Sequence, residues 1–257
     1  MPVRVIVFDL GHTLWDIGDA GDALAGAYER ARETLVIALG PGRVPPAAAL
    51  QSAVTDALRD SAETYFMQSP NLEQPPTHTW VDAGCRSFGL VLTPALLREI
   101  TPPLFATETE RLICHDGTRD AVRRLADRGY RVGCITNTLA DGAAIRRMLQ
   151  LHGFGDIMQS VVVSSEEGWR KPHPSLFHKS LRELRATAAE AVFVGDSPWH
   201  DIAGAAAVGM HTVLTRQYVS RPDVVGTTPD AIIHHVRELA DVVSRLDSPA
   251  PRTRAGG

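Results

Sequence analysis

The chain has 257 residues, of which 44% are hydrophobic and 22% charged, and a net charge of −4 at pH 7. These values are typical of a soluble globular protein with one large domain, or with a core domain and a smaller insert. The weak negative charge argues against nucleic acid or a membrane as a partner, and no apolar run approaches the length of a membrane span. Three scattered cysteines argue against a disulfide framework, and the N-terminus enters a strand-like run directly, so we expect a cytoplasmic location.

The first predicted element is a strand, and a helical region follows it. Val3–Phe8 is apolar except for Arg4, as expected for a strand buried on both faces of a parallel sheet. Between residues 18 and 110 apolar residues recur at helical spacing, with Gly-rich and Pro-rich breakers between the segments. The helices predicted there are Ala23–Leu39, Ala47–Met67, His78–Leu90 and Pro94–Leu104. This region is therefore predicted to be an all-helical insert.

Strands and helices alternate after the insert. The predicted strands are Arg131–Ile135, Val161–Val163, Ala191–Val194, His211–Leu214 and Ala231–Ile233. The predicted helices are Arg119–Arg128, Gly142–Leu151, Ser175–Leu184, Asp201–Val208 and His235–Leu246. This alternation predicts an α/β fold with a doubly wound parallel sheet. Residues 1–17 and 111–247 would form the core domain, 18–110 the insert, and 248–257 a disordered tail rich in Pro, Gly and Arg.

Four short motifs fall at predicted strand ends or in the loops just beyond them. They are Val-Ile-Val-Phe-Asp-Leu-Gly-His-Thr-Leu at 5–14, Val-Gly-Cys-Ile-Thr-Asn at 132–137, Gly-Trp-Arg-Lys-Pro-His-Pro at 168–174 and Val-Phe-Val-Gly-Asp-Ser-Pro-Trp-His-Asp at 192–201. Doubly wound sheets bind their ligands at the carboxyl ends of the strands. The order and spacing of these motifs resemble those of the haloacid dehalogenase-like (HAD) hydrolases, most of which are magnesium-dependent phosphatases with an aspartate nucleophile.

The resemblance implies a role for each matching residue. Asp9 would be the nucleophile that forms an aspartyl-phosphate. Thr136, Asn137 and Lys171 would hold the phosphoryl group. The metal ligands implied for Mg²⁺ are Asp9, the carbonyl of Gly11, Asp196 and Asp201. The helical insert corresponds to the family's movable cap, which selects the substrate, and Trp15, beside the first motif, is expected to contact that substrate.

One position departs from the family pattern. Where the phosphatases read Asp-x-Asp-x-Thr, this chain has Gly11 in place of the second Asp, which protonates the leaving group and then activates water. Losing such help typically slows a reaction about 10²–10⁴-fold. Three explanations stay open: a substrate with a good leaving group, a substitute acid such as His12, or a loss of catalysis. A branch of the family with Asp-Leu-Gly-Asn-Val at this place includes phosphatases, so the glycine does not by itself abolish activity.

Two other branches of the family are weaker matches. Haloacid dehalogenases also lack the second Asp, but they read Asp-x-Tyr and need no metal, whereas this chain has Gly11 and keeps Asp196. Phosphonoacetaldehyde hydrolases need a Schiff-base lysine from the cap, and residues 1–170 contain no lysine.

The expected function is a magnesium-dependent phosphatase acting on a small phosphorylated metabolite, as a monomer or homodimer. The alternative is a catalytically weak HAD-fold protein that binds a phosphorylated ligand or a protein partner.

Overall fold

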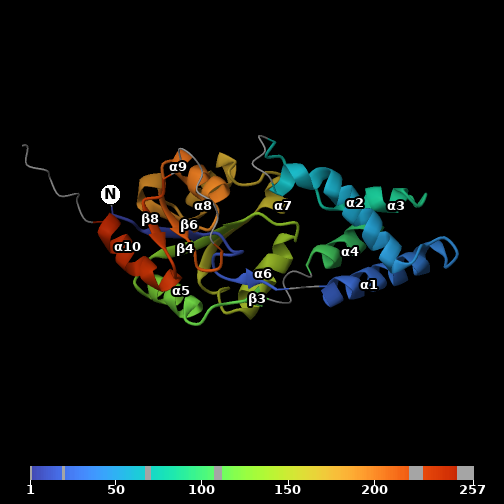
Figure 1. Cartoon of the computed structure of the whole chain (residues 1–257), viewed down its shortest axis with the longest axis horizontal. Coiled ribbons are helices and arrows are strands. Elements are labelled where there is room, and N and C mark those ends of the chain that lie inside the picture. The colour runs from blue at the N-terminus through green and yellow to red at the C-terminus, as the bar shows by residue number, and fades with distance from the viewer. Residues whose placement is uncertain (1, 19–20, 67–70, 107–111, 220–227, 248–257) are drawn as a thin grey trace, which may run out of the picture.

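The computed structural model describes residues 2–18, 21–66, 71–106, 112–219 and 228–247. Figure 1 shows two parts side by side, a sheet covered by helices and a separate group of helices formed by the insert. The predicted tail at 248–257 lies outside the described residues.

A six-stranded, all-parallel sheet forms the first part, with the strand order β5-β4-β1-β6-β7-β8. Its strands are β1 (Val5–Phe8), β4 (Arg131–Thr136), β5 (Met158–Val163), β6 (Ala191–Gly195), β7 (His211–Thr215) and β8 (Ala231–Ile233). The chain adds strands outward from β1 on one side and outward from β6 on the other. The winding therefore reverses between β1 and β6, and a crevice for ligands is expected beyond the carboxyl ends of these two strands. The predicted α/β fold is confirmed.

Alternate side chains of β1 build two cores, one on each face of the sheet. Ile6 and Phe8 belong to the cluster under α5, α6 and α10, and Val5 and Val7 belong to the cluster under α8 and α9. The bounds of these helices are α5 (Thr118–Asp127), α6 (Gly142–Leu151), α8 (Pro174–Glu183), α9 (Gly204–Ala207) and α10 (Leu239–Leu246). Because both faces are covered, the strands have the continuous apolar sequence that was used to predict them.

The insert contains four helices with a hydrophobic cluster of their own. They are α1 (Gly21–Leu39), α2 (Ala47–Phe66), α3 (His78–Arg86) and α4 (Pro94–Phe105). Tyr28, Leu50, Trp80 and Ile100 are among the buried residues of this cluster. The chain enters and leaves the insert through two short antiparallel strands, β2 (Asp16–Ile17) and β3 (Leu112–Ile113), which pair with each other.

Several elements differ from the sequence prediction. The β2–β3 pair and the short helix α7 (Ser164–Glu167) were not predicted, because two-residue strands and a single helical turn carry no periodicity. The predicted helix 201–208 is instead a π-helical turn, η3 (Pro198–Ala203), followed by α9. Short 3₁₀ turns, η2 (Ala188–Glu190) and η4 (Val236–Glu238), precede β6 and α10. The remaining boundaries differ by a few residues, as helix ends commonly do.

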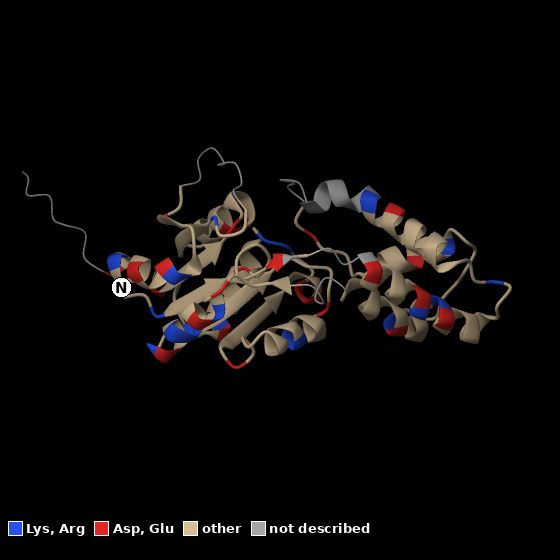
Figure 2. Cartoon of the chain, turned by 60° about the horizontal axis from the view of Figure 1, so that its bottom comes forward, with Lys and Arg blue, Asp and Glu red and all other residues tan. Residues whose placement is uncertain are grey.

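Charged residues lie mainly on helices and loops, and acidic and basic side chains are interspersed over both parts of the molecule (Figure 2). Among the described helices, none is both long and apolar enough to cross a membrane.

We predict that Gly84→Ala destabilises the insert, because α2 and α3 approach closely at Gly84. An added Cβ would lie 2.9 Å from the backbone nitrogen of Val54 and 2.7 Å from its Cγ2. Alanine favours a helix over glycine by about 1 kcal/mol, but overpacking costs about 1–3 kcal/mol, so a net loss of up to about 2 kcal/mol is expected. Urea unfolding measures it. In the matched control, Gly42→Ala, the new Cβ meets nothing within 4 Å; equal stability of the two variants would contradict the prediction.

Candidate active site

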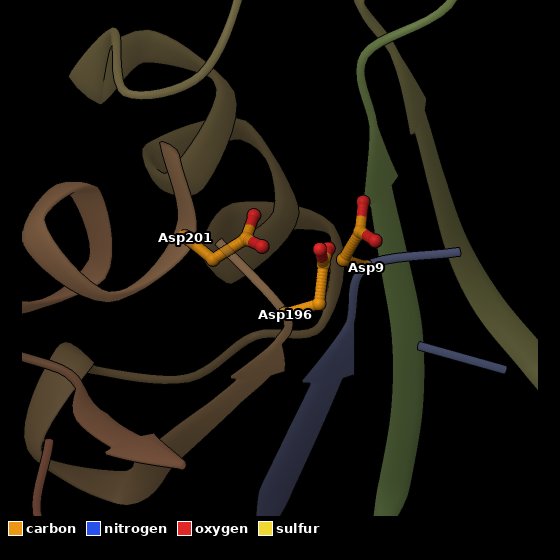
Figure 3. Close-up of side chains that lie close together, drawn as sticks. All are labelled: Asp9, Asp196 and Asp201. Atoms are coloured by element: carbon orange, nitrogen blue, oxygen red, sulfur yellow. The ribbon is translucent and has the colours of Figure 1, made fainter. Parts of the chain in front are cut away.

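Three buried carboxylates converge where the winding of the sheet reverses. Asp9 follows β1, Asp196 follows β6, and Asp201 lies in η3 (Figure 3). One oxygen from each of the three lies within 4.8 Å of the others. The exposed fractions of these residues are 7%, 5% and 1%, respectively. Buried carboxylates at this density repel one another unless cations compensate them.

Backbone contacts hold Asp201 in this cluster. Its Oδ2 accepts a hydrogen bond from the backbone N–H of Ser197 (2.9 Å), and its own N–H donates to the Ser197 carbonyl (3.0 Å). The carboxylate lies directly over Gly195, where an added Cβ would overlap it. Glycine at 195 therefore allows the Asp201 carboxylate to approach the end of β6. The π-helical turn η3 carries Asp201 to this position, and such turns are often found at functional sites.

Lys171 joins two of the three carboxylates. Its Nζ lies 2.5 Å from Asp9 Oδ1 and 2.7 Å from Asp201 Oδ1, and only 2% of the side chain is exposed. A buried, hydrogen-bonded pair of this kind is strongly disrupted when one partner is removed, because the other charge stays buried. The loop that carries Lys171 is thus tied by its side chain to the ends of β1 and η3.

The charges in this cluster do not balance. The three carboxylates bring three negative charges, and Lys171 brings one positive charge. Burial, together with the carboxylates of Asp201 and Asp196, raises the pKa of Asp9 to about 7, although Lys171 acts in the opposite direction. Burial disfavours the charged form of Lys171, but the carboxylates of Asp201 and Asp9 outweigh it and raise the pKa of the ammonium.

The donor set fits a hard divalent cation. Carboxylate oxygens within 4.8 Å of one another are the ligands that Mg²⁺ uses, and two added positive charges would neutralise the excess negative charge. Haloacid dehalogenase-like hydrolases generally use a divalent metal.

The loops after β4 and around residue 171 are joined by Asn137. Its Oδ1 accepts a hydrogen bond from the Lys171 backbone N–H (2.8 Å), and its Nδ2 donates to the Lys171 carbonyl (3.2 Å). The side chain therefore positions Lys171, and only the second N–H of Nδ2 is left for the phosphoryl contact expected from the sequence. Thr136 ends β4 and is 5% exposed.

The loop after Asp9 presents His12 beside an acid that the sequence analysis did not select. His12 has a left-handed backbone (φ 57°), and its Nδ1 lies 2.8 Å from Oδ1 of Asp16. About a third of each side chain is exposed, at 32% and 38%. The contact lacks hydrogen-bond geometry, so it brings a carboxylate charge close to the imidazole without fixing the ring by a hydrogen bond. The four-residue spacing of His12 and Asp16 was visible in the sequence, but only the turn makes them neighbours.

The structure corrects the expectation for Trp15. The residue is 2% exposed, and its ring packs against Phe154 (centroids 5.7 Å apart) and His152 (6.3 Å). It belongs to the core cluster under α6 and does not line an entrance. The indole was expected to contact substrate because it adjoins a motif, but burial of its large apolar surface determines its position.

A model of the haloacid dehalogenase-like hydrolases matches residues 3–209 of the chain. The chain belongs to this family. Among curated proteins it is 35% identical over 145 residues to glyceraldehyde 3-phosphate phosphatase of Pyrococcus abyssi, covering 55% of this chain and 52% of the relative. It is 37% identical over 98 residues to ribulose-1,5-bisphosphate 5-phosphatase of Halopiger xanaduensis, covering 37% and 39%. The matched segment thus spans about half, or less, of the length of these relatives.

Solved structures share the fold over almost the whole chain. A 2-haloacid dehalogenase from Pseudomonas syringae pv. tomato superposes with a TM-score of 0.68 at 24% identity, over 95% of this chain and 99% of the other. A HAD phosphatase from Thermococcus onnurineus superposes with a TM-score of 0.58 at 23% identity, over 94% and 98%. The predicted family resemblance is confirmed.

The raised pKa of Asp9 generates a prediction about metal affinity. A proton on Asp9 competes with a divalent cation, so Mg²⁺ is expected to bind more weakly as the pH falls below about 7, by up to about tenfold per pH unit. Calorimetric titration with Mg²⁺ across this range measures the effect. Asp9→Asn, which cannot be protonated in the same way, should bind weakly with little pH dependence. Equal affinity of the unaltered protein at about pH 6 and about pH 8 would refute the prediction.

Proposed function

We propose that this hydrolase is a magnesium-dependent phosphatase that cleaves a small phosphorylated metabolite through an aspartyl-phosphate on Asp9. The observation that carries the proposal is the cluster of Asp9, Asp196 and Asp201 with Lys171, buried at the point where the sheet winding reverses. A site with three carboxylates and one ammonium suits a substrate that arrives with a divalent cation and brings further negative charge to the lysine.

Each residue has a separate task in this reaction. An oxygen of Asp9 attacks phosphorus while the bond from phosphorus to the leaving oxygen breaks. Lys171 holds phosphoryl oxygens by charge, and Thr136 and Asn137 donate hydrogen bonds to them. Water then attacks the aspartyl-phosphate and releases inorganic phosphate, which restores the Asp9 carboxylate.

Asp9, Asp196, Asp201 and the carbonyl of Gly11 would hold Mg²⁺. When bound, the cation supplies positive charge that offsets the carboxylates and the incoming phosphate. Asp201 would also hold Lys171 in place. One of its oxygens accepts a hydrogen bond from Lys171, and the other accepts one from the backbone N–H of Ser197.

His12 is the proposed proton donor in place of the missing second Asp. It follows Gly11 directly, it is partly exposed, and Asp16 lies 2.8 Å from its Nδ1. In this role the imidazole would give a proton to the leaving oxygen and take one from the attacking water.

The substrate proposal rests on the relatives and on the insert. The matched relatives are named for phosphatase activity on glyceraldehyde 3-phosphate and ribulose-1,5-bisphosphate. We propose that residues 18–110 are a cap domain that closes over a core domain of residues 1–17 and 111–247. Closure would exclude water from the phosphoryl site. A cytoplasmic monomer or homodimer fits this role.

The alternative of a catalytically weak binding protein is supported by Gly11, which brings no carboxylate. Purified protein assayed on glyceraldehyde 3-phosphate, ribulose-1,5-bisphosphate, pyrophosphate and a wider panel, with and without Mg²⁺, separates the two. Release of halide ion from a 2-haloacid in the absence of metal would instead support a dehalogenase.

We predict that Asp9→Asn abolishes phosphate release while the protein stays folded. The amide keeps the shape of the carboxylate but cannot attack phosphorus. Steady-state assays with circular dichroism measure both properties. The control is Asp156→Asn, because Asp156 is an exposed residue paired with Arg123 at 2.9 Å and lies outside the cluster. More than a few per cent residual activity in Asp9→Asn would rule out Asp9 as the nucleophile.

A second pair of variants tests the missing acid. If His12 already supplies the proton, Gly11→Asp should leave hydrolysis of alkyl phosphates nearly unchanged. A site without an acid would instead gain up to about 10²-fold on alkyl phosphates and less on aryl phosphates, since aryl leaving groups need little protonation.

His12→Asn is the partner variant, because asparagine tolerates the left-handed backbone at this position but cannot carry the proton. A large loss on alkyl phosphates in His12→Asn would support His12 as the acid. No change in either variant, in folded protein that binds Mg²⁺, would favour the binding protein.

A further inference from the structure

The insert touches the sheet-containing part along a short antiparallel contact. Residues 71–74, between α2 and α3, run beside residues 168–170, which lead into Lys171. The N–H of Gln74 donates to the Gly168 carbonyl (2.9 Å), and the N–H of Arg170 donates to the Leu72 carbonyl (2.9 Å). Nη2 of Arg170 also donates to the Asn71 carbonyl (2.6 Å). The insert is thereby fastened to the loop that carries the buried lysine.

The side chain of Gln74 reaches a second loop of the site. Its Nε2 donates to the carbonyl of Thr138 at 2.8 Å, and the residue is 2% exposed. Thr138 follows Thr136 and Asn137, and its N–H donates a hydrogen bond to Ser164 Oγ (3.0 Å). One residue of the insert therefore contacts the loop after β4 through its side chain and the loop before Lys171 through its backbone.

These two loops already depend on each other. Asn137 pairs with both backbone groups of Lys171. Leu139, in the loop after β4, packs against the hydrophobic cluster of the insert. The loop bearing the proposed phosphoryl ligands thus contacts the insert at two adjacent residues, through the hydrogen bond to Thr138 and the apolar contact of Leu139.

We propose that Gln74 is a positioning residue by which the docked insert fixes the loops of Thr136, Asn137 and Lys171 in their working arrangement. This inference rests on the proposed function, because it makes phosphoryl binding depend on a residue of the insert. Gln74 acts through the Thr138 and Gly168 carbonyls, so docking of the insert and completion of the phosphoryl site occur together.

Two variants remove the side-chain contact in different ways. Gln74→Ala leaves the backbone bond to Gly168 and deletes the donor to Thr138. Gln74→Glu keeps the length but replaces the donor with an acceptor, which repels the Thr138 carbonyl. The control is Glu73→Gln, because Glu73 is the exposed neighbour on the same segment. All three proteins are compared with the unaltered chain in the presence of Mg²⁺.

The expected result has three parts. Both Gln74 variants lower kcat/KM about tenfold, mainly through kcat, because the phosphoryl contacts are used most fully in the transition state. They also weaken binding of inorganic phosphate, measured by calorimetry, by a smaller factor. Hydrogen exchange quickens at residues 137–140 and 168–171 but not in β1 or β6. Glu73→Gln matches the unaltered protein in every measurement.

The proposal is overturned if both Gln74 variants keep normal phosphate binding and normal exchange in the two loops. It is also overturned if exchange quickens throughout the insert and the sheet, because Gln74 would then be a general stability residue. If the unaltered protein cleaves no phosphate ester, the proposed function fails, but phosphate binding and loop exchange still decide the role of Gln74.

Discussion

The ammonium of Lys171 between Asp9 and Asp201 is the interaction on which the rest of the site depends. Burying three carboxylates within 4.8 Å of one another costs hydration, and the ammonium of Lys171, which contacts two of them, offsets part of that cost. The lysine has to arrive from a loop far along the chain, and that loop is held by Asn137 and by the insert. The charges of the cluster therefore link the end of β1, the turn η3 and the loop that carries Lys171.

The position of this cluster follows from the order of the strands. Asp9 and Asp196 are distant in sequence, but β1 and β6 are neighbours in the sheet, and both carboxylates follow the carboxyl ends of their strands. Helices cannot cover this edge at the point where the winding reverses, because the connections on either side lead away from it. The same topology that builds two apolar cores thus leaves one place for charged side chains to meet a ligand.

Features that depend on local sequence pattern, or on where a strand ends, could be predicted from the sequence. The sheet, the four-helix insert and the convergence of Asp9, Asp196, Asp201 and Lys171 could be predicted, because continuous apolar strands end at fixed residues and parallel strands end at one edge. Trp15 was misplaced because its packing against Phe154 and His152 comes from a distant segment. The closeness of Asp16 to His12 and the hydrogen bond from Gln74 to Thr138 were missed because neither Asp16 nor Gln74 stands in a motif.

The insert has a core of its own, and this explains how it can influence the site without being part of the sheet. Its buried cluster is separate from the two clusters around the strands, so its internal packing survives a change in its position. Its described contacts with the loops of the site include hydrogen bonds of Gln74 and Arg170 and an apolar contact of Leu139. Each such hydrogen bond contributes only about 1 kcal/mol. In the proposed reaction, an insert docked through such contacts would release and return with each turnover, and each return would restore the same arrangement of Lys171 and Thr136.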